Sequence, residues 1–253
     1  MNLHFKFKPK KSLGQNFLVD ENVLGEIVAV AELKNTDTVL EVGPGLGVLT
    51  KELIKRAGKV IAVEKDIRLS EDLNSKSEIR NPNLQIINQD ILRFHLDKYI
   101  PGQYKVVANI PYYLTSKLFQ YFLEQKNKPT LMVLMVQKEV GERVVAKPGE
   151  LSVLGISVQI YSDAEIVSYV SKQSFWPVPK VDSVVLKIVP KNKYPEIDDQ
   201  KKFFSIVKRA FTGKRKQIKN TIGDIEILNK AGIDPTLRPQ DLSLEDWIKL
   251  YQA

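Results

Sequence analysis

Short apolar runs that suit β-strands alternate with segments of helical spacing from about Thr38 onward. The first such runs are Thr38–Val42, Lys59–Val63, Leu84–Ile87, Lys105–Ala108 and Leu131–Met135. This alternation is typical of a parallel sheet that helices cover on both faces. Two later runs, Ala164–Val170 and Ser183–Val189, flank a proline-containing loop and are expected to pair antiparallel. The pattern predicts an α/β fold built on a doubly wound, seven-stranded sheet.

The pattern changes after Pro190, where a polar, proline-flanked stretch leads into sequence of helical spacing. We therefore predict a domain over residues 1–190 and a small helical domain over residues 191–253. Within the second, Lys201–Lys219 holds eight Lys or Arg residues and no acid, interleaved with aromatic and aliphatic side chains. This composition predicts a basic amphipathic helix surface, and a merely solvated helix face is the alternative.

Composition restricts the chemistry of the 253-residue chain. A formal net charge of +8 and a pI near 9.3 favour a polyanionic partner, with nucleic acid first among them. The chain has no cysteine and two histidines, which excludes disulfides, thiolate nucleophiles and Cys/His zinc sites, and no metal is expected. No apolar run is as long as a membrane span, and the N-terminus lacks a signal-peptide core. We expect a cytoplasmic, monomeric protein without a membrane partner.

A glycine-rich loop follows the first predicted strand, in Glu41–Gly47 (Glu-Val-Gly-Pro-Gly-Leu-Gly). Its amides precede a predicted helix over 48–57, where a nucleotide-like cofactor can approach the backbone closely. Glu64, about twenty residues later at the end of the second strand, suits hydrogen bonds to ribose hydroxyls. The spacing departs from the dinucleotide pattern, because Val48 stands where the third glycine belongs. Asp90 and Ile91 follow the third strand and suit adenine, although Asp90 could instead be a helix N-cap.

The fourth strand ends in Asn109–Tyr112 (Asn-Ile-Pro-Tyr), which combines an amide, a rigid turn and an aromatic ring. An amide oxygen and a neighbouring backbone carbonyl can accept both hydrogens of an exocyclic amine, and the ring can stack on a base. Pro111 restricts the backbone at this point. An ordinary strand-ending turn is the alternative.

The ordered set of motifs resembles the S-adenosylmethionine-dependent adenine methyltransferases, and more narrowly the bacterial small-subunit (16S) ribosomal RNA adenine dimethyltransferases. The narrower resemblance rests on Lys10–Leu18, Leu151–Val153, Phe175–Ser183, Ala210–Lys216 and Leu242–Trp247, which together span nearly the whole chain. It implies a Rossmann-like methyltransferase domain followed by a helical RNA-binding domain. Val178 replaces the family's usual third proline.

The resemblance implies a role for each matched residue. The S-adenosylmethionine site would comprise Asn16, Leu18, Gly43, Gly45, Glu64, Asp90, Ile91 and Asn109. The catalytic set would be Asn109, Ile110, Pro111 and Tyr112, with Phe175 as the opposite wall of the target adenine. RNA-binding residues would be Lys10, Lys11, Lys208, Arg209, Lys214, Arg215 and Lys216. In the N-terminal arm, a plain turn at Gly14–Asn16 and core packing of Phe17 and Leu18 remain alternatives.

The implied reaction is N6-dimethylation of two adjacent adenines in the 3′-terminal hairpin of small-subunit rRNA during assembly of the 30S subunit. No general base is assigned, because the amine loses its proton only after it has become cationic. Large-subunit (23S) resistance methyltransferases share the Asn-Ile-Pro-Tyr motif and are one alternative. A noncatalytic RNA-binding relative and a nicotinamide oxidoreductase are the others. The flanking motifs favour the small-subunit enzyme, the catalytic residues argue against a noncatalytic relative, and the glycine spacing argues against the oxidoreductase.

Overall fold

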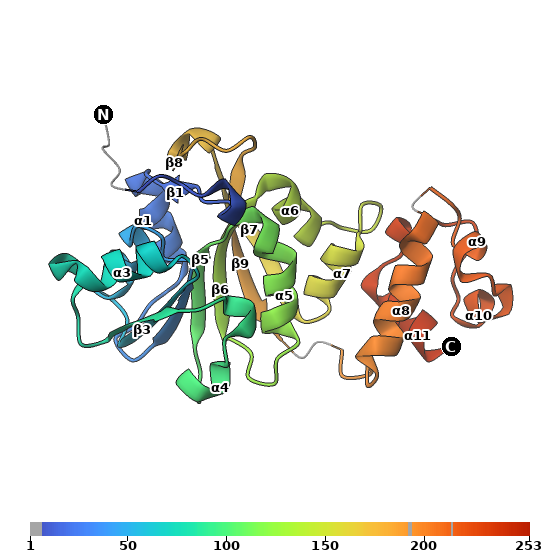
Figure 1. Ribbon diagram of the computed structural model, residues 1–253. Helices are drawn as coiled ribbons and strands as arrows, with labels where there is room; N and C mark the ends of the chain where they lie inside the picture. Colours follow the sequence, from blue (N-terminus) through green and yellow to red (C-terminus); the bar gives the residue numbers. More distant parts are fainter. Residues whose placement is uncertain (1–6, 192–193, 214) are drawn as a thin grey trace. The chain divides into compact units, whose positions relative to one another are not determined.

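The computed structural model describes residues 7–191, 194–213 and 215–253. Seven strands form one sheet in the order β4-β3-β2-β5-β6-β9-β7 (Figure 1). The strands are β2 (Thr38–Val42), β3 (Lys59–Glu64), β4 (Leu84–Asn88), β5 (Lys105–Asn109), β6 (Leu131–Gln137), β7 (Ser162–Val170) and β9 (Ser183–Pro190). The predicted seven-stranded α/β sheet is confirmed, with every predicted apolar run inside a strand.

Strand direction follows the predicted doubly wound pattern for most of the sheet. The pairs β3–β4, β2–β3, β2–β5 and β5–β6 are parallel, and β9 runs antiparallel to β6. The carboxyl ends of β2, β3, β4 and β5 therefore share one edge of the sheet, the edge at which α/β folds bind ligands. The glycine loop, Glu64, Asp90 and Asn109 all lie at this edge.

Helices cover both faces of the sheet, because its central strands have no polar face. Val39 and Leu40 point to opposite faces and both are fully buried. Helix α1 lies on one side of the sheet and α5 on the other (Figure 1). The helices of this part are α1 (Glu21–Val30), α2 (Val48–Leu53), α3 (Ile67–Ser75), α4 (Leu96–Tyr99), α5 (Thr115–Leu123) and α6 (Lys138–Val144).

A second, two-stranded sheet joins distant parts of the chain and was not predicted. In it β1 (Phe17–Leu18) pairs antiparallel with β8 (Phe175–Trp176), so that Phe17 lies opposite Trp176 and Leu18 opposite Phe175. The rings of Phe17 and Trp176 stack with centroids 6.3 Å apart. Sequence analysis missed this sheet because two-residue strands carry no periodicity.

The chain divides into two compact units, one of Met1–Gly141 with Glu165–Val189 and one of Glu142–Ala164 with Pro190–Ala253. This division differs from the predicted continuous 1–190 domain, because residues 142–164 group with the C-terminal segment. Contacts within the second unit explain the grouping: the Lys191 N–H donates to the Tyr161 carbonyl oxygen at 2.7 Å, and the Tyr161 ring lies 6.2 Å from that of Phe204.

The second unit is helical. It contains α7 (Val153–Gln159), α8 (Gln200–Ala210), α9 (Lys219–Ile222), α10 (Ile225–Lys230) and α11 (Leu244–Gln252). Helix α8 buries Phe203, Val207 and Ala210, which are spaced by four and three residues on one face. Across the described ranges, no helix is long and apolar enough to cross a membrane.

Candidate active site

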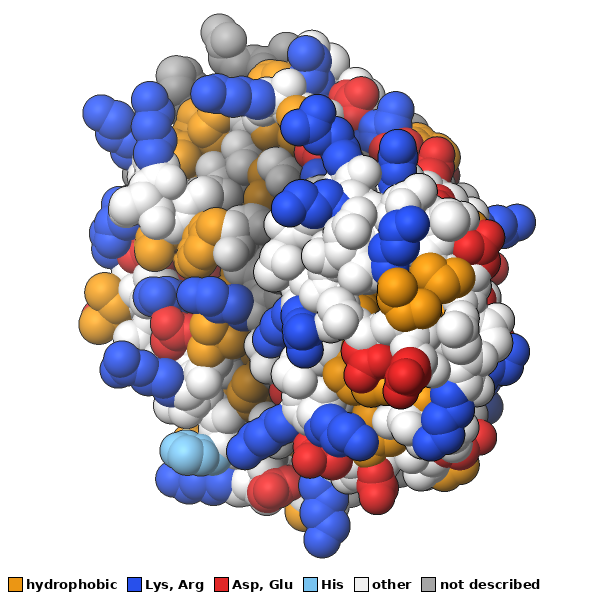
Figure 2. Space-filling model, turned by 90° about the vertical axis from the view of Figure 1, so that its right-hand side faces the viewer, with side chains coloured by type: hydrophobic (Ala, Val, Ile, Leu, Met, Phe, Trp, Pro, Cys, Tyr) orange, Lys and Arg blue, Asp and Glu red, His pale blue; other side chains and the backbone are white. Residues whose placement is uncertain are grey.

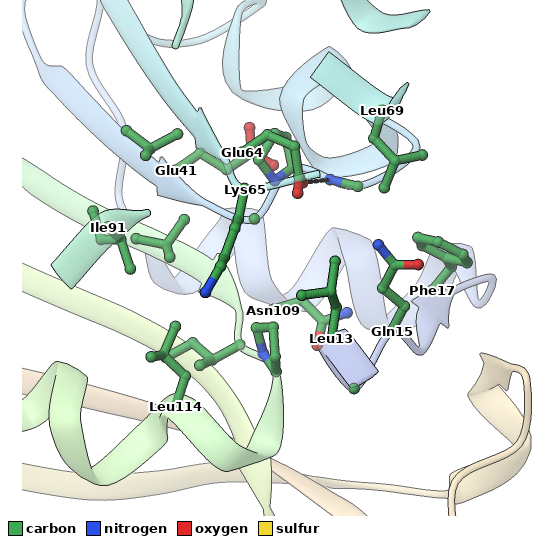
Figure 3. Close-up of a pocket in the computed structure, with 18 of the residues that line it drawn as sticks. Leu13, Gln15, Phe17, Glu41, Glu64, Lys65, Leu69, Ile91, Asn109 and Leu114 are labelled. Carbon is green, nitrogen blue, oxygen red and sulfur yellow. Dashed lines mark hydrogen bonds between the residues drawn. The ribbon is translucent and has the colours of Figure 1, made fainter. Parts of the chain in front are cut away.

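A pocket opens at the carboxyl edge of the first unit's sheet. The N-terminal residues Leu13, Gln15 and Phe17 lie on one side, Ile91 lies on the opposite side, and Glu64 and Lys65 lie between them (Figure 3). The predicted site residues that line the pocket are Asn16, Leu18, Gly43, Gly45, Glu64, Asp90, Ile91, Asn109, Ile110, Pro111 and Tyr112.

The glycine loop forms a cradle of backbone beside a buried carboxylate. Gly43 and Gly45 have φ values of +67° and +59°, in the left-handed region that only glycine adopts cheaply. Glu64 accepts hydrogen bonds from the Gly45 N–H at 3.1 Å and from the Asp66 N–H at 2.7 Å. Burial raises the pKa of Glu64, and these two N–H donors oppose that rise. Glu64 is thus held in place facing the pocket.

Asp90 is a helix N-cap, one of the two roles considered for it, and it also lines the pocket. Its Oδ1 accepts from the Leu92 N–H at 3.0 Å and so caps the short helix η3 (Ile91–Arg93). Its Oδ2 lies 2.8 Å from the Lys65 Nζ, a pocket-lining group that sequence analysis missed. The Lys65 ammonium holds the pKa of Asp90 below its ordinary value. Asp90 is therefore an ionised acceptor at the pocket wall.

Asn109 and Tyr112 are fixed by contacts from separate parts of the chain. The Asn109 Nδ2 donates to the Asn16 carbonyl oxygen at 3.3 Å, so the N-terminal arm orients the amide. The Ile110 N–H donates to the Met135 carbonyl oxygen at 3.2 Å, which anchors the turn to β6. The half-buried Tyr112 places its hydroxyl 2.8 Å from the Ser183 Oγ at the start of β9. The turn is thus held from three sides.

The Tyr112–Ser183 hydrogen bond predicts a non-additive pair of mutants. Ser183→Ala and Tyr112→Phe should each lower the single-turnover rate of methyl transfer by about 2- to 12-fold, the equivalent of about 0.5–1.5 kcal/mol. The double variant should be no slower than either single variant, because both remove one interaction. Ser205→Ala, at an exposed position of α8 in the second unit, is the control. Additive losses would show that the two hydroxyls act independently.

Phe175 does not lie at the position predicted from the sequence. It is 2% exposed and packs in the core cluster that includes Leu18, Val23 and Val170, and it does not line the pocket. The expectation that it forms the opposite wall of the target base is not met by this structure. The reason is its pairing with Leu18 in the small sheet, which turns the side chain into the core.

Glu41, the first residue of the glycine-rich motif, is a pocket-lining acid for which the sequence predicted no role. It is 1% exposed. Burial, with a smaller contribution from the Glu64 charge, raises the pKa of Glu41 from its ordinary 4.5 to about 8. Its position near the end of the strand, just before the glycine loop, is the sequence feature that could have identified it.

The raised pKa of Glu41 predicts a dependence of stability on pH. The folded state retains this proton between pH 4.5 and about 8, where the unfolded chain has lost it. The stabilising effect is complete below about pH 4.5 and is lost as pH rises toward 8, with a slope of at most about 1.4 kcal/mol per unit. Denaturant unfolding of wild type and Glu41→Gln across this range tests it. Parallel stability curves for the two proteins would contradict the assignment.

The N-terminal arm is fastened to Asp66, another group that sequence analysis missed. The Asp66 carboxylate accepts from the Gln15 Nε2 at 3.0 Å, the Lys10 Nζ at 3.1 Å and the Arg68 Nη2 at 2.6 Å. The Arg68 guanidinium and these further donors hold the pKa of Asp66 well below its usual range. The N-terminal arm, which lines the pocket, is thus tied to Asp66, and the Asp66 N–H in turn donates to Glu64.

The predicted RNA-binding side chains lie in two places. In the first unit Lys11 is exposed, but the Lys10 charge is already paired with Asp66. In the second unit Lys208, Arg209, Arg215 and Lys216 are exposed, and Lys214 falls outside the described residues. Lys and Arg side chains are spread over the face drawn in Figure 2, with Asp and Glu between them. Among the described residues no cluster of three or more His, Cys, Asp or Glu could hold a metal ion.

Comparison with known proteins gives the family. The family model described as "Ribosomal RNA adenine dimethylase" matches residues 6–253. Curated relatives named "Ribosomal RNA small subunit methyltransferase A" include one from Dehalococcoides mccartyi, 45% identical over 97% of this chain and 88% of the relative. Another from Moorella thermoacetica is 39% identical over 97% of this chain and 92% of the relative.

Solved structures agree with this placement. A dimethyladenosine transferase from Plasmodium falciparum is 25% identical, with a TM-score of 0.79, over 92% of this chain and 95% of that one. The 23S rRNA methyltransferase ErmE is 29% identical, with a TM-score of 0.75, over 93% of this chain and 98% of that one. The near end-to-end match includes the glycine loop, Glu64 and the Asn-Ile-Pro-Tyr turn. The chain therefore belongs to the ribosomal RNA adenine dimethylase family.

Proposed function

We propose that this protein transfers methyl groups from S-adenosylmethionine to N6 of two adjacent adenines in the 3′-terminal hairpin of small-subunit rRNA, giving dimethyladenines. One observation carries the proposal: a single pocket brings together a glycine cradle, Glu64 and Asp90 on one side and the Asn109–Tyr112 turn on the other. The first set suits a nucleoside cofactor and the second suits an exocyclic amine.

The residues present fit S-adenosylmethionine. The positive φ values at Gly43 and Gly45 keep the loop free of side chains beside the pocket. Glu64 would accept from the ribose hydroxyls, and the ionised Asp90 would accept from the adenine amine, with Ile91 beneath the ring. When bound, S-adenosylmethionine supplies a methyl group on a positively charged sulfur, and breaking that sulfur–carbon bond leaves neutral S-adenosylhomocysteine as the product.

The turn residues would position the attacking nitrogen. The Asn109 Nδ2 is committed to the Asn16 carbonyl, so its Oδ1 remains for one N6 hydrogen while the Ile110 carbonyl accepts the other. With both hydrogens held, the nitrogen lone pair points at the methyl, and such positioning can contribute several kcal/mol. Tyr112 would stack on an adenine taken out of its helix. The new cationic amine releases its proton to solvent, so these residues need no base.

Two transfers to one nitrogen place a further demand on the turn. A monomethylated amine retains one hydrogen for two acceptors, so the second transfer relies on a single hydrogen bond and on stacking. The substrate would be rRNA within a 30S subunit or its precursor, and the protein would act as a cytoplasmic monomer.

The basic segment of the second unit would contact the rRNA backbone. Lys208 and Arg209 project from α8 away from its buried face, and Arg215 and Lys216 follow it. Arg215→Gln with Lys216→Gln should weaken subunit binding and reduce its salt dependence, by up to about two units of log–log slope. Filter binding at several salt concentrations measures both quantities.

A matched control removes the same charge elsewhere. Lys55→Gln with Arg56→Gln breaks two ion pairs to Glu52, each 2.6 Å long, on the first unit. This variant should bind subunits with wild-type affinity and salt slope. Wild-type affinity and wild-type salt slope in the Arg215 and Lys216 variant would show that the RNA contact lies elsewhere. Exposed Lys11 would then be the next residue to test.

Labelled methyl transfer tests the proposed function against its main alternative. The protein would be incubated with labelled S-adenosylmethionine and with small or large ribosomal subunits that lack their adenine methylation. Label in the small subunit alone supports the proposal. Label in the large subunit would favour the activity named for ErmE, and no label in either would favour a noncatalytic role.

A further inference from the structure

Three strand ends meet beside the Asn109–Tyr112 turn, and Asp182 links them. The Lys138 N–H, directly after β6, donates to the Asp182 carbonyl oxygen at 3.0 Å. The Lys172 N–H, just beyond β7, donates to the Asp182 Oδ1 at 2.9 Å. The end of β6, the end of β7 and the start of β9 are therefore held together at one place on the first unit.

This place adjoins the ring assigned to base stacking. Ser183 follows Asp182 directly, is fully buried, and lies 2.8 Å from the Tyr112 hydroxyl through its Oγ. Ser183 also lies opposite Gln137 in the β6–β9 pairing, one residue before Lys138. Lys138 thus directly follows the residue that pairs with Ser183, the hydrogen-bond partner of Tyr112.

Tyr169 lies beside Lys138 with its ring largely in solvent. It is 62% exposed, the largest value among the exposed large hydrophobic residues of the described chain, and it is the penultimate residue of edge strand β7. The Lys138 Nζ lies over the ring, 5.6 Å from its centroid. Core packing therefore does not account for this side chain. Val178 and Val181, in the loop before β9, are also exposed.

An aromatic ring beside a lysine is the combination that binds an unpaired nucleotide. The base stacks on the ring, and the ammonium pairs with the phosphate. An apolar peptide would gain little from Lys138, whereas a nucleotide uses both groups.

We propose that Tyr169 and Lys138 bind an unpaired RNA nucleotide next to the target adenine, with the base on the Tyr169 ring and the phosphate on Lys138. The inference rests on the proposed function for the identity of the target, and it extends the RNA contact beyond the pocket. The site would hold the flanking strand while Tyr112 holds the adenine, which favours adenines displayed in a loop over those in a duplex.

Binding and steady-state kinetics of three variants test the proposal. Tyr169→Ala should weaken binding of an RNA hairpin carrying the small-subunit 3′ end by about fivefold or more, and should raise the KM for RNA with little change in kcat. Tyr169→Phe keeps the stacking face and should behave as wild type. Lys138→Gln should lower the salt slope of RNA binding by about one unit.

Matched controls separate this role from a structural one. Val167→Ala removes an exposed side chain from the same face of β7, two residues away, and should leave RNA affinity unchanged. All variants should keep wild-type affinity for S-adenosylmethionine and wild-type Tm. RNA binding is measured without methyl transfer, so it tests this surface even if the proposed reaction fails. Wild-type RNA affinity and KM in Tyr169→Ala would overturn the proposal and leave the proposed function standing.

Discussion

Asn109→Ala is expected to lower the single-turnover rate of methyl transfer to small subunits by about 100- to 1000-fold. The substitution removes the proposed side-chain acceptor for the adenine amine. It also removes the donor to the Asn16 carbonyl, a hydrogen bond that ties the N-terminal arm to the turn. Misplacing the attacking nitrogen by a fraction of an ångström to an ångström costs rate on this scale. Rapid-quench measurement with saturating enzyme isolates the chemical step.

Tyr112→Ala is the informative companion to this variant. It should also suppress transfer while leaving affinity for S-adenosylmethionine close to wild type, because the ring is proposed to stack on the base and not to touch the cofactor. Asn109→Ala should in addition weaken cofactor binding, since Asn16 and Asn109 line the pocket together. A rate for Asn109→Ala within threefold of wild type would remove the amide from the mechanism.

Glu64→Ala is expected to weaken binding of S-adenosylmethionine by about 1–3 kcal/mol, roughly 5- to 150-fold in Kd. Part of the loss comes from ribose hydroxyls left without an acceptor. The rest comes from the glycine loop, because the Gly45 and Asp66 N–H groups lose the carboxylate that they share. Isothermal titration calorimetry measures the affinity.

Glu64→Gln serves as the control, since it keeps one acceptor oxygen and should retain an intermediate affinity. A thermal melt of each variant separates loop damage from loss of the ligand contact. An unchanged Kd in Glu64→Ala, or tight binding of a nicotinamide dinucleotide to wild type, would reject the assignment of the pocket.

The pattern of apolar runs was enough to predict the main sheet. Strands such as Thr38–Val42 and Leu131–Gln137 are short and buried on both faces, so their apolar runs stand out in the local sequence. The residues at their carboxyl ends could be placed at one edge from topology alone. Glu64, Asp90 and Asn109 were found in this way, and all line the pocket.

Long-range contacts account for what sequence analysis missed. Phe175 was expected at the target base, but its pairing with Leu18 across more than 150 residues turns it into the core. The Lys65–Asp90 ion pair and the fastening of Lys10 and Gln15 to Asp66 also join separate segments. No local pattern encodes such pairs. The grouping of residues 142–164 with the C-terminal helices has the same origin.

Mapping the methylated nucleotides tests the central claim most directly. Small subunits that lack adenine methylation would be incubated with the protein and S-adenosylmethionine, and the rRNA digested and analysed by mass spectrometry. The account predicts two adjacent N6-dimethyladenines in the 3′-terminal hairpin, absent with Asn109→Ala. Methylation at another base, at a single isolated adenine, or only in large-subunit rRNA would contradict it.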